Sequence, residues 1–208
     1  MPRMRTQPSV SLSEHRLQLF DSSRSLADTV SAFLIGGLQS NENAIIVATP
    51  EHRELLSRRL EDAGWNVRKL IAANRLFVAD AAQTLEKFMR RETPSPIAFD
   101  EVVGTIVGRM AAGKRVWIYG EMVDVLAARG NYRGAQLLED LWNVLGQREC
   151  FTLFCGYASG HFGDPRTAEA LAGICAAHDC VHRKSEDILA EFLLDQQRSG
   201  SRTPISSK

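Results

Sequence analysis

The sequence of 208 residues lacks a long hydrophobic segment: no apolar run approaches the ~18 residues that a helix needs to cross a bilayer. Its N-terminal stretch, MPRMRTQPSVSLSEH, has no apolar core of the kind found in secretory signals. We therefore expect a cytoplasmic protein that does not enter membranes. In that compartment the four cysteines are expected to be reduced.

The sequence also lacks an excess of charge of either sign. Lys+Arg and Asp+Glu both number 25, which gives a formal net charge of zero. Proteins that hold nucleic acid or a membrane surface through bulk charge are usually strongly basic. The equal numbers of basic and acidic residues therefore argue against direct binding of nucleic acid. The hydrophobic share of 44% is typical of a globular domain with a proper core.

Short apolar runs alternate with segments of helical periodicity along the chain. This alternation predicts an α/β fold in three layers, with a mostly parallel sheet and helices on both faces. We expect one domain over 13–197, between a flexible tail at 1–12 and a disordered tail at 198–208. The expected strands are 15–20, 44–49, 76–80, 114–120 and 150–157; the expected helices are 26–38, 50–64, 82–92, 99–113, 121–130, 132–147, 166–178 and 184–197.

One stretch, GRMAAGKR, matches part of a phosphate-binding loop. Gly108, Gly113 and Lys114 fit the spacing G-x-x-x-x-G-K, but Arg115 stands where a Ser or Thr should reach magnesium. A phosphate-binding loop also needs a strand before it and a helix after it, and here the expected order is reversed. We interpret the stretch as a helix that ends at Gly113, with basic residues near its C-terminal dipole.

A phosphate-binding loop would instead be expected in the first strand–loop–helix, RLQLFDSSRSLADTV. That loop contains no glycine and no lysine, and Asp21 would repel phosphate. Ser22, Ser23 and Arg24 either bind a small anion at the helix N-terminus or simply cap the helix. We therefore expect no nucleotide hydrolysis of the usual kind and no cofactor.

Ligands of open parallel sheets bind beyond the carboxyl ends of the strands. The expected ends lie at 21–24, 49–51, 80, 119–121 and 155–157, and we expect them to converge on one crevice. Glu121 directly follows an apolar strand. It is either a first-turn carboxylate favoured by the helix dipole or a pocket group for a polar ligand. Tyr119, Cys155 and Tyr157 are further candidates for this crevice.

The segment LLEDLWN places three side chains on one helix face. Glu139, Trp142 and Asn143 stand at i, i+3 and i+4. They either line a pocket, or Trp142 belongs to the core while the two polar residues bind nearby backbone groups. His15 is expected to precede the first strand, at the opposite end from the crevice, as a structural histidine.

The segment CAAHDCVHRK contains four side chains of types that zinc accepts, namely Cys175, His178, Cys180 and His182. Their spacing is not a standard one, so buried, reduced cysteines are the first expectation and metal binding the weaker alternative. The segment GYASGHF reads G-x-x-S-G, one residue away from a nucleophile elbow. No catalytic triad follows from the sequence, so we expect a protein that is not an enzyme.

Several stretches taken together resemble the MEDS domain, a sensory domain named after methanogens, methylotrophs and a dichloromethane-responsive regulator. The resemblance covers roughly residues 13 to 182. It implies a RecA-like fold, related to the circadian-clock ATPases, without a functional phosphate-binding loop. It also implies a bacterial signalling protein that senses small molecules and passes the signal to a kinase or a DNA-binding output. The stretches are FLIGGLQSNENAIIVATPEHRELLSRRLEDAGWNV, LFVADAAQTLEKFM, YGEMVDVLAARGN, LLEDLWN and FTLFCGY.

The resemblance also bears on single residues. It makes Glu121 and Tyr157 stronger candidates for residues that line a pocket. Asn41 and Asn43 depart from the Gly-Glu turn that the family usually has, and no output domain is expected after residue 182. The residues that match positions we expect the family to hold are His15, Glu121, Glu139, Trp142, Asn143, Cys155 and Tyr157.

Three functional hypotheses follow. The first is a stand-alone sensory domain that binds a small molecule in the strand-end crevice and regulates a separate kinase or transcription regulator. In that case the segment ILAEFLL (188–194) could contact the partner or form a homodimer. The second is an interaction module without a ligand. The third is a divergent nucleotide-binding protein or a hydrolase that uses Cys155.

Overall fold

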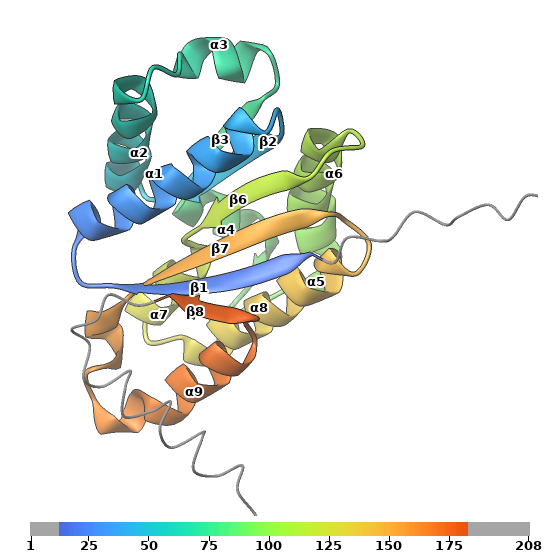
Figure 1. The fold of residues 1–208 in the computed structure, drawn as a ribbon. Coiled ribbons are helices and arrows are strands. Elements are labelled where there is room, and N and C mark those ends of the chain that lie inside the picture. Colours follow the sequence, from blue (N-terminus) through green and yellow to red (C-terminus); the bar gives the residue numbers. More distant parts are fainter. Residues whose placement is uncertain (1–12, 183–208) are drawn as a thin grey trace, which may run out of the picture.

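The computed structural model describes residues 13–182, which form an α/β fold in three layers (Figure 1). One six-stranded sheet has the order β3-β2-β6-β7-β1-β8, and its neighbouring strands are all parallel. The expected fold class is thereby confirmed. The strands are β1 (Glu14–Phe20), β2 (Asn43–Ala48), β3 (Leu76–Asp80), β6 (Val116–Gly120), β7 (Phe151–Ala158) and β8 (Cys180–His182).

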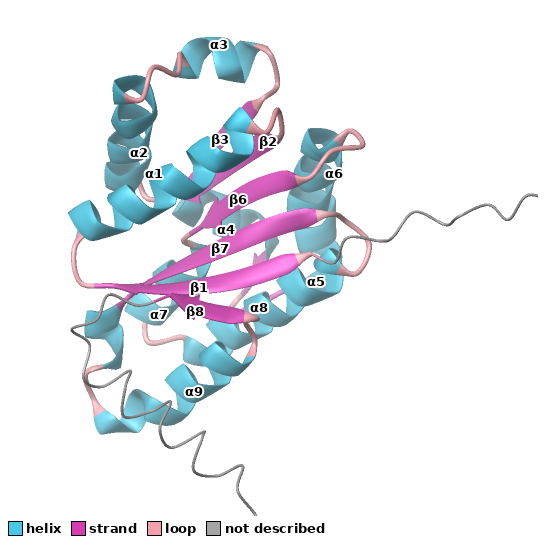
Figure 2. Cartoon of the chain, viewed as in Figure 1, coloured by secondary structure: helices cyan, strands magenta, loops and turns pink. Residues whose placement is uncertain are grey.

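Helices cover both faces of the sheet, as Figure 2 shows. The first three helices pack on one face: α1 (Ser23–Gln39), α2 (Pro50–Asp62) and α3 (Val67–Ala72). The others pack on the opposite face. They are α4 (Ala81–Phe88), α5 (Pro96–Phe99), a π-helix (Asp100–Gly104), α6 (Thr105–Ala111), α7 (Met122–Ala128), α8 (Tyr132–Gly146) and α9 (Ala168–Ala176).

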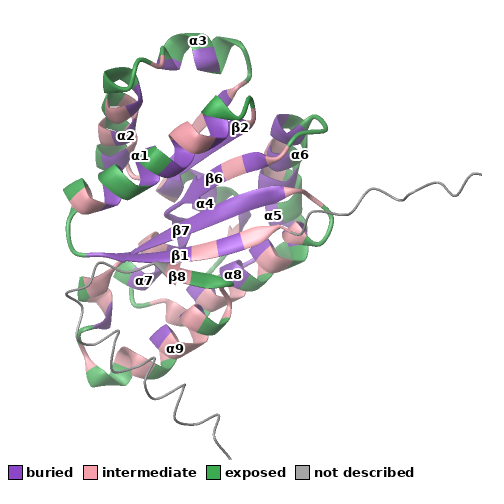
Figure 3. Cartoon of the chain, viewed as in Figure 1, coloured by how far each residue is buried: buried purple, intermediate pink, exposed green. Residues whose placement is uncertain are grey.

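The side chains of each central strand alternate between two hydrophobic cores, because successive residues of a strand point to opposite faces. In β2, Ile46 packs with α1–α3 while Ile45 and Val47 pack with the other helices. Both faces are covered, so the central strands are buried almost throughout (Figure 3). The same alternation separates Tyr119, which faces α1–α3, from Cys155, which faces α4–α9.

Side chains at the strand–helix junctions explain where several helices begin. The Oγ of Ser22 accepts a hydrogen bond from the backbone N–H of Ser25, and Asp80 caps α4 in the same way. Pro50 occupies the first turn of α2, where a missing N–H costs nothing. These junctions lie at the carboxyl ends of parallel strands, and so at one edge of the sheet.

The match to a phosphate-binding loop is coincidental, as expected. The matched stretch begins within helix α6, and the strand β6 follows it. The turn uses left-handed backbone at Ala112 (φ 41°) and Gly113 (φ 83°), which ends the helix. The Nζ of Lys114 donates to the carbonyl of Asn41 at 3.0 Å.

Several short elements were not foreseen. The helix expected over 82–92 ends at Phe88, where a hairpin of β4 (Met89–Arg90) and β5 (Thr93–Pro94) begins. The segment expected as one helix over 99–113 contains a π-helical stretch, and both α3 and β8 were missed. Elements this short give no clear periodicity in a sequence.

Some expectations fall on parts of the chain that the structure does not describe. The helix expected over 184–197, its segment ILAEFLL, and the tails at 1–12 and 198–208 lie outside the described residues. Among residues 13–182, no helix has the length and apolar character to span a bilayer.

Candidate functional site

Glu121 lies at the carboxyl edge of the sheet, between β6 and α7, and its side chain is fully buried. Its Oε1 accepts a hydrogen bond from the hydroxyl of Tyr119 at 2.5 Å and lies 2.5 Å from Nδ1 of His52. Its Oε2 accepts from the backbone N–H of Thr49 at 2.7 Å. A buried carboxylate needs such partners, since an unpaired one would cost several kcal/mol.

A chain of hydrogen bonds connects this buried carboxylate with the surface. The Nε2 of His52 lies 2.9 Å from Oγ of Ser23, and that hydroxyl donates to Glu51 at 3.1 Å. Ser23 is partly exposed in the first turn of α1, while the side chain of His52 is only 11% exposed. We call Ser23, Glu51, His52, Tyr119 and Glu121 the carboxyl-edge cluster.

The charge of Glu121 governs the protonation of its neighbours. Burial lowers the pKa of His52, but the hydrogen bond to Glu121 and its negative charge outweigh burial, so the pKa lies above the usual 6.5. Burial and the same charge raise the pKa of Tyr119 well above its ordinary value. The tyrosine hydroxyl therefore stays protonated and donates to Glu121.

The rim of this edge is acidic. Asp124 accepts from the backbone N–H of Ala158 at 2.8 Å and lies 3.1 Å from Nε2 of His161. Burial raises the pKa of Asp124, against the lowering effects of the Ala158 N–H and His161. Asp21 accepts a hydrogen bond from Ser159. With Glu51 and Glu121, these carboxylates make the edge unfavourable for an anion.

Three other residues expected at this edge, Ser22, Arg24 and Asp80, lie outside the carboxyl-edge cluster. Ser22 caps α1, as the simpler interpretation held, and Arg24 is exposed. Asp80 caps α4 and accepts a hydrogen bond from Arg53 at 3.0 Å. His52 was not predicted as a site residue, although it lies directly after the strand-end residues 49–51, where ligands of parallel sheets bind.

The expectation of one shared crevice is wrong. Strand β7 continues to Ala158, so Cys155 and Tyr157 lie within the strand and not beyond its end. Both face α4–α9, whereas Tyr119 belongs to the core under α1–α3. The candidate residues therefore form two clusters on opposite faces of the sheet.

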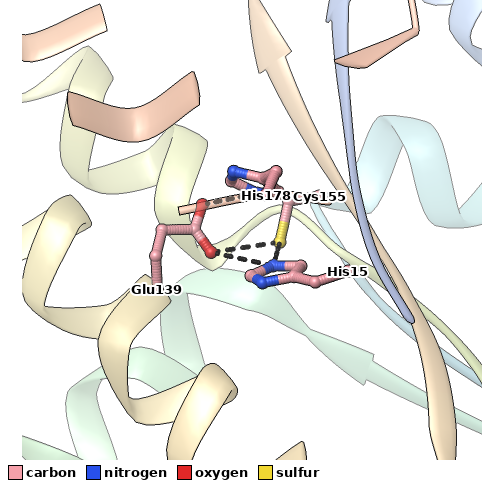
Figure 4. Close-up of side chains that lie close together, drawn as sticks. All are labelled: His15, Glu139, Cys155 and His178. Carbon is pink, nitrogen blue, oxygen red and sulfur yellow. Dashed lines mark hydrogen bonds and ion pairs between the residues drawn. The ribbon is translucent and has the colours of Figure 1, made fainter. Parts of the chain in front are cut away.

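The second cluster surrounds Glu139 of α8 (Figure 4). Its Oε2 accepts from Sγ of Cys155 at 3.4 Å and lies 3.2 Å from Nε2 of His15. Its Oε1 accepts from the hydroxyl of Tyr157 at 2.7 Å and lies 3.4 Å from Nε2 of His178. We call His15, Glu139, Cys155 and His178 the His–Cys cluster; their ligand-type atoms all lie within 4.8 Å of one another.

Both histidines of this cluster are held by their other ring nitrogen. Nδ1 of His15 lies 2.8 Å from Oδ1 of Asn143, and Nδ1 of His178 lies 2.7 Å from the carbonyl of Ile174. Both partners are acceptors, so Nδ1 carries the proton in each ring and Nε2 faces the cluster. His15 lies inside β1, not before it, because the strand already begins at Glu14.

The ionisation of the cluster centres on Glu139. Burial raises its pKa, but the charges of His178 and His15 outweigh burial and bring the pKa below its usual range. Burial lowers the pKa of His178, but the charge of Glu139 outweighs this and raises it. Burial, together with Glu139, raises the pKa of the Cys155 thiol and of Tyr157 well above their usual values.

Trp142 and the cysteines near the C-terminal end of the described chain lie apart from this cluster. Trp142 packs edge-on against Phe99 and Phe151 in the core, with ring centroids 5.3 and 5.9 Å away. The weaker alternative was a metal site in 175–182. Of its members whose side chains the structure describes, His178 belongs to the His–Cys cluster, whereas Cys180 is exposed on β8 and Cys175 lies outside the cluster. The side chain of His182 is outside the described part of the chain.

Comparisons with known proteins agree with this architecture. A family model described as the MEthanogen/methylotroph, DcmR Sensory domain (MEDS) matches residues 14–178. A solved structure of a KaiC-like protein from the hyperthermophilic archaeon Pyrococcus horikoshii OT3 superposes with a TM-score of 0.53 at 16% identity. The match covers 85% of this chain and 75% of that one, which shows a shared RecA-like fold. No curated protein matches the chain in sequence.

Proposed function

Since the chain belongs to the MEDS family of sensory domains, we propose that it binds a small molecule at the carboxyl-edge cluster and regulates a separate signalling protein. The observation that carries this proposal is the chain of contacts Ser23–His52–Glu121, which connects a partly exposed hydroxyl with a buried carboxylate. It joins the starts of α1 and α2 to the end of β6. A ligand that displaces the Ser23 contact changes the surroundings of His52, and through it those of Glu121.

The charges at this edge restrict the chemistry of the ligand. Asp21, Glu51, Glu121 and Asp124 favour a cation or a neutral molecule rich in hydrogen-bond donors. A phosphate would face these carboxylates in a loop without glycine or lysine. We therefore propose an amine, alcohol or amide of low molecular mass as the ligand class, and not a nucleotide.

Sensing requires that the ligand prefer one of two protein states, since only differential affinity shifts an equilibrium. The junctions at this edge would connect ligand binding with a change of protein state, because movement of His52 moves the start of α2 relative to α1. The partner's affinity should therefore change when the ligand saturates the site. Unchanged partner affinity at saturation would contradict the regulatory half of the proposal.

A thermal-shift scan tests the binding half. The panel contains small amines, alcohols and amides, and ATP with magnesium. A ligand at a hundred times its Kd stabilises by ~2.7 kcal/mol, and at 2–4 °C per kcal/mol this raises Tm by roughly 5–11 °C. We expect the shift with a donor-rich molecule and its loss in Glu121→Gln.

The matched control is Glu54→Gln, which removes an exposed carboxylate from the same helix as His52 and should keep the shift. A shift with ATP and magnesium that survives Glu121→Gln would overturn the proposed ligand class. No shift with any molecule of the panel would favour the interaction module without a ligand.

The same geometry favours one further candidate, ester hydrolysis. A serine hydroxyl 2.9 Å from one imidazole nitrogen, with a carboxylate 2.5 Å from the other, has the order of a Ser–His–acid site. In such a reaction His52 would take the proton as Oγ of Ser23 attacks the carbonyl carbon. The contact from Ser23 to Glu51 competes for that hydroxyl proton, so we rank this candidate second.

Labelling with a fluorophosphonate probe tests the hydrolase candidate. An activated Ser23 should be labelled, Ser23→Ala should abolish the labelling, and Ser22→Ala should leave it in place. Failure to label the folded wild-type protein would remove the candidate. Cys155 is a weaker candidate for a nucleophile, because burial raises the pKa of its thiol and favours the protonated form.

A further inference from the structure

On the opposite face of the sheet, the geometry points to a metal site: we infer that His15, Glu139, Cys155 and His178 together bind one divalent ion of the zinc class. This inference is independent of the proposed ligand at the carboxyl edge. Imidazole nitrogen, thiolate sulfur and carboxylate oxygen are the three ligand types that Zn²⁺ takes in proteins. Each of the four residues supplies one such atom, and these atoms lie within 4.8 Å of one another.

The distances within the cluster agree with the edges of a coordination tetrahedron. Zinc–ligand bonds of about 2.0–2.3 Å give edges of roughly 3.3–3.7 Å. Nε2 of His15 lies 3.4 Å from Sγ of Cys155 and 3.2 Å from Oε2 of Glu139. That sulfur lies 3.4 Å from the same oxygen. Three of the four ligand atoms thus already stand at distances that a shared ion requires.

The surrounding hydrogen bonds also have the pattern of a metal site. Metal-binding histidines donate their second ring N–H to a carbonyl or carboxylate oxygen, which fixes the ring orientation. Oδ1 of Asn143 accepts this hydrogen bond from His15, and the carbonyl oxygen of Ile174 accepts it from His178. A ligating carboxylate is usually hydrogen-bonded as well, and Tyr157 donates to Oε1 of Glu139.

One buried nitrogen of the His–Cys cluster lacks a hydrogen-bond partner. Nε2 of His178 makes no hydrogen bond within the described residues, although its side chain is 0% exposed. It lies 3.4 Å from Oε1 of Glu139. Coordination of an ion by this nitrogen would satisfy it, since buried polar groups in proteins are nearly always paired.

The charges balance when an ion is bound. Zn²⁺ would replace the proton on Sγ of Cys155 and any proton on Nε2 of either histidine, and these protons would go to solvent. The dication with one thiolate, one carboxylate and two neutral imidazoles has no net charge. An uncharged assembly suits a site buried under α8 and α9, where an unpaired charge is costly.

The four ligands come from distant parts of the chain. His15 belongs to β1, Glu139 to α8, Cys155 to β7, and His178 to the turn between α9 and β8. The ion would therefore tie the last described segment, α9–β8, to the centre of the sheet. This arrangement stabilises a fold more than a site formed by one local loop, because it joins elements that the unfolded chain keeps far apart.

Cobalt titration of the full chain tests the inference. The purified protein is stripped with a chelator and titrated with Co²⁺, whose bond to a thiolate gives a charge-transfer band in the near ultraviolet. We expect one equivalent to bind, with that band and the visible spectrum of four-coordinate cobalt. One equivalent of Zn²⁺ should then displace it and raise Tm. Uptake of less than one equivalent by the folded wild-type protein would overturn the site.

Variants identify the ligands. Cys155→Ser should lose the charge-transfer band, whereas Cys175→Ser and Cys180→Ser should keep it. Loss of the band in Cys180→Ser and its retention in Cys155→Ser would contradict the ligand set. If Cys155→Ser does not fold by circular dichroism, His178→Gln and Glu139→Gln replace it, and each should weaken cobalt binding.

A positioning variant supplies a separate readout. Asn143→Ala removes the acceptor for Nδ1 of His15 but no ligand, so it should weaken affinity by about 10–100-fold and keep the charge-transfer band. Unchanged affinity in this variant would count against His15 as a ligand. Mass spectrometry of the metal content, before any chelator is added, then identifies the ion that the protein carries when purified from cells.

Discussion

Two fully buried glutamates, Glu121 and Glu139, occupy opposite sides of the same sheet and have similar partners. Each accepts a hydrogen bond from a tyrosine of the sheet, and each contacts at least one histidine. The contacts of Glu121 lead outward to partly exposed Ser23, whereas those of Glu139 end at buried side chains. A cluster that reaches the surface suits a ligand that binds and leaves reversibly. An enclosed cluster suits a group that remains bound, such as a structural ion.

The largest expected effect concerns the enclosed glutamate. Glu139→Ala, measured in the presence of a chelator, should lower the free energy of unfolding by about 3–5 kcal/mol, because it leaves buried histidines without their carboxylate. Denaturation in urea measures the change. The control Glu61→Ala removes an exposed carboxylate from α2 and should cost less than ~0.5 kcal/mol. A loss as small as that of the control would show that Glu139 does not hold its cluster together.

Glu121→Ala should cost less, about 2–3 kcal/mol. The side chain of His52 is 11% exposed and contacts Ser23, so it can regain water once the carboxylate is gone. The same denaturation experiment gives the comparison. A larger loss for Glu121→Ala than for Glu139→Ala would reverse the proposed distinction between an open and an enclosed cluster.

Removal of the two tyrosine hydroxyls should have a smaller and similar effect on each side. Tyr157→Phe and Tyr119→Phe each remove one donor to a glutamate that keeps other partners, at a cost of about 1–2 kcal/mol. Because the two hydroxyls serve different clusters, the double variant should show the sum within ~0.5 kcal/mol. A larger deviation from additivity would indicate that the two clusters are coupled through the sheet.

The smallest effect concerns the pH dependence of stability at the open cluster. Glu121, Glu51 and Asp124 face His52 and raise its pKa in the folded state. Its stabilising contribution is therefore complete below the unfolded pKa of about 6.5 and is lost as pH rises through the folded pKa. The destabilisation by His52→Gln should be larger below pH ~6 than above pH ~8. NMR titration of the His52 ring checks the direction, and a folded pKa below 6.5 would contradict it.

Most of the fold could be predicted from the sequence, because five of its strands are apolar runs bounded by turns. The strand at 76–80 was predicted with its observed limits, and Pro50 marked the start of α2. The hairpin after Phe88 and the three-residue strand β8 could not be predicted. They are set by contacts with distant parts of the chain, such as the pairing of Cys180 with Arg16.

The candidate residues were largely identified, but their grouping was not. Glu121 followed from its place after a strand, and the i, i+4 spacing placed Glu139 and Asn143 on one helix face. Successive side chains of a strand point to opposite faces of the sheet. Applied to the strand-end residues, this rule would have placed Cys155 and Tyr119 on opposite faces. The meeting of His15 with His178 could not have been foreseen, because it depends on the turn after α9 and on β8 beside β1.

Strand β8 has a mechanical consequence. It pairs with β1 at three residue positions and ends at His182, the last described residue. A force applied to the chain after residue 182 reaches this short pairing first. It reaches His178 next, two residues before the strand begins. Resistance to extension at this end therefore rests on this short backbone ladder, on the bonds between Asp179 and His15, and on the side chain of His178.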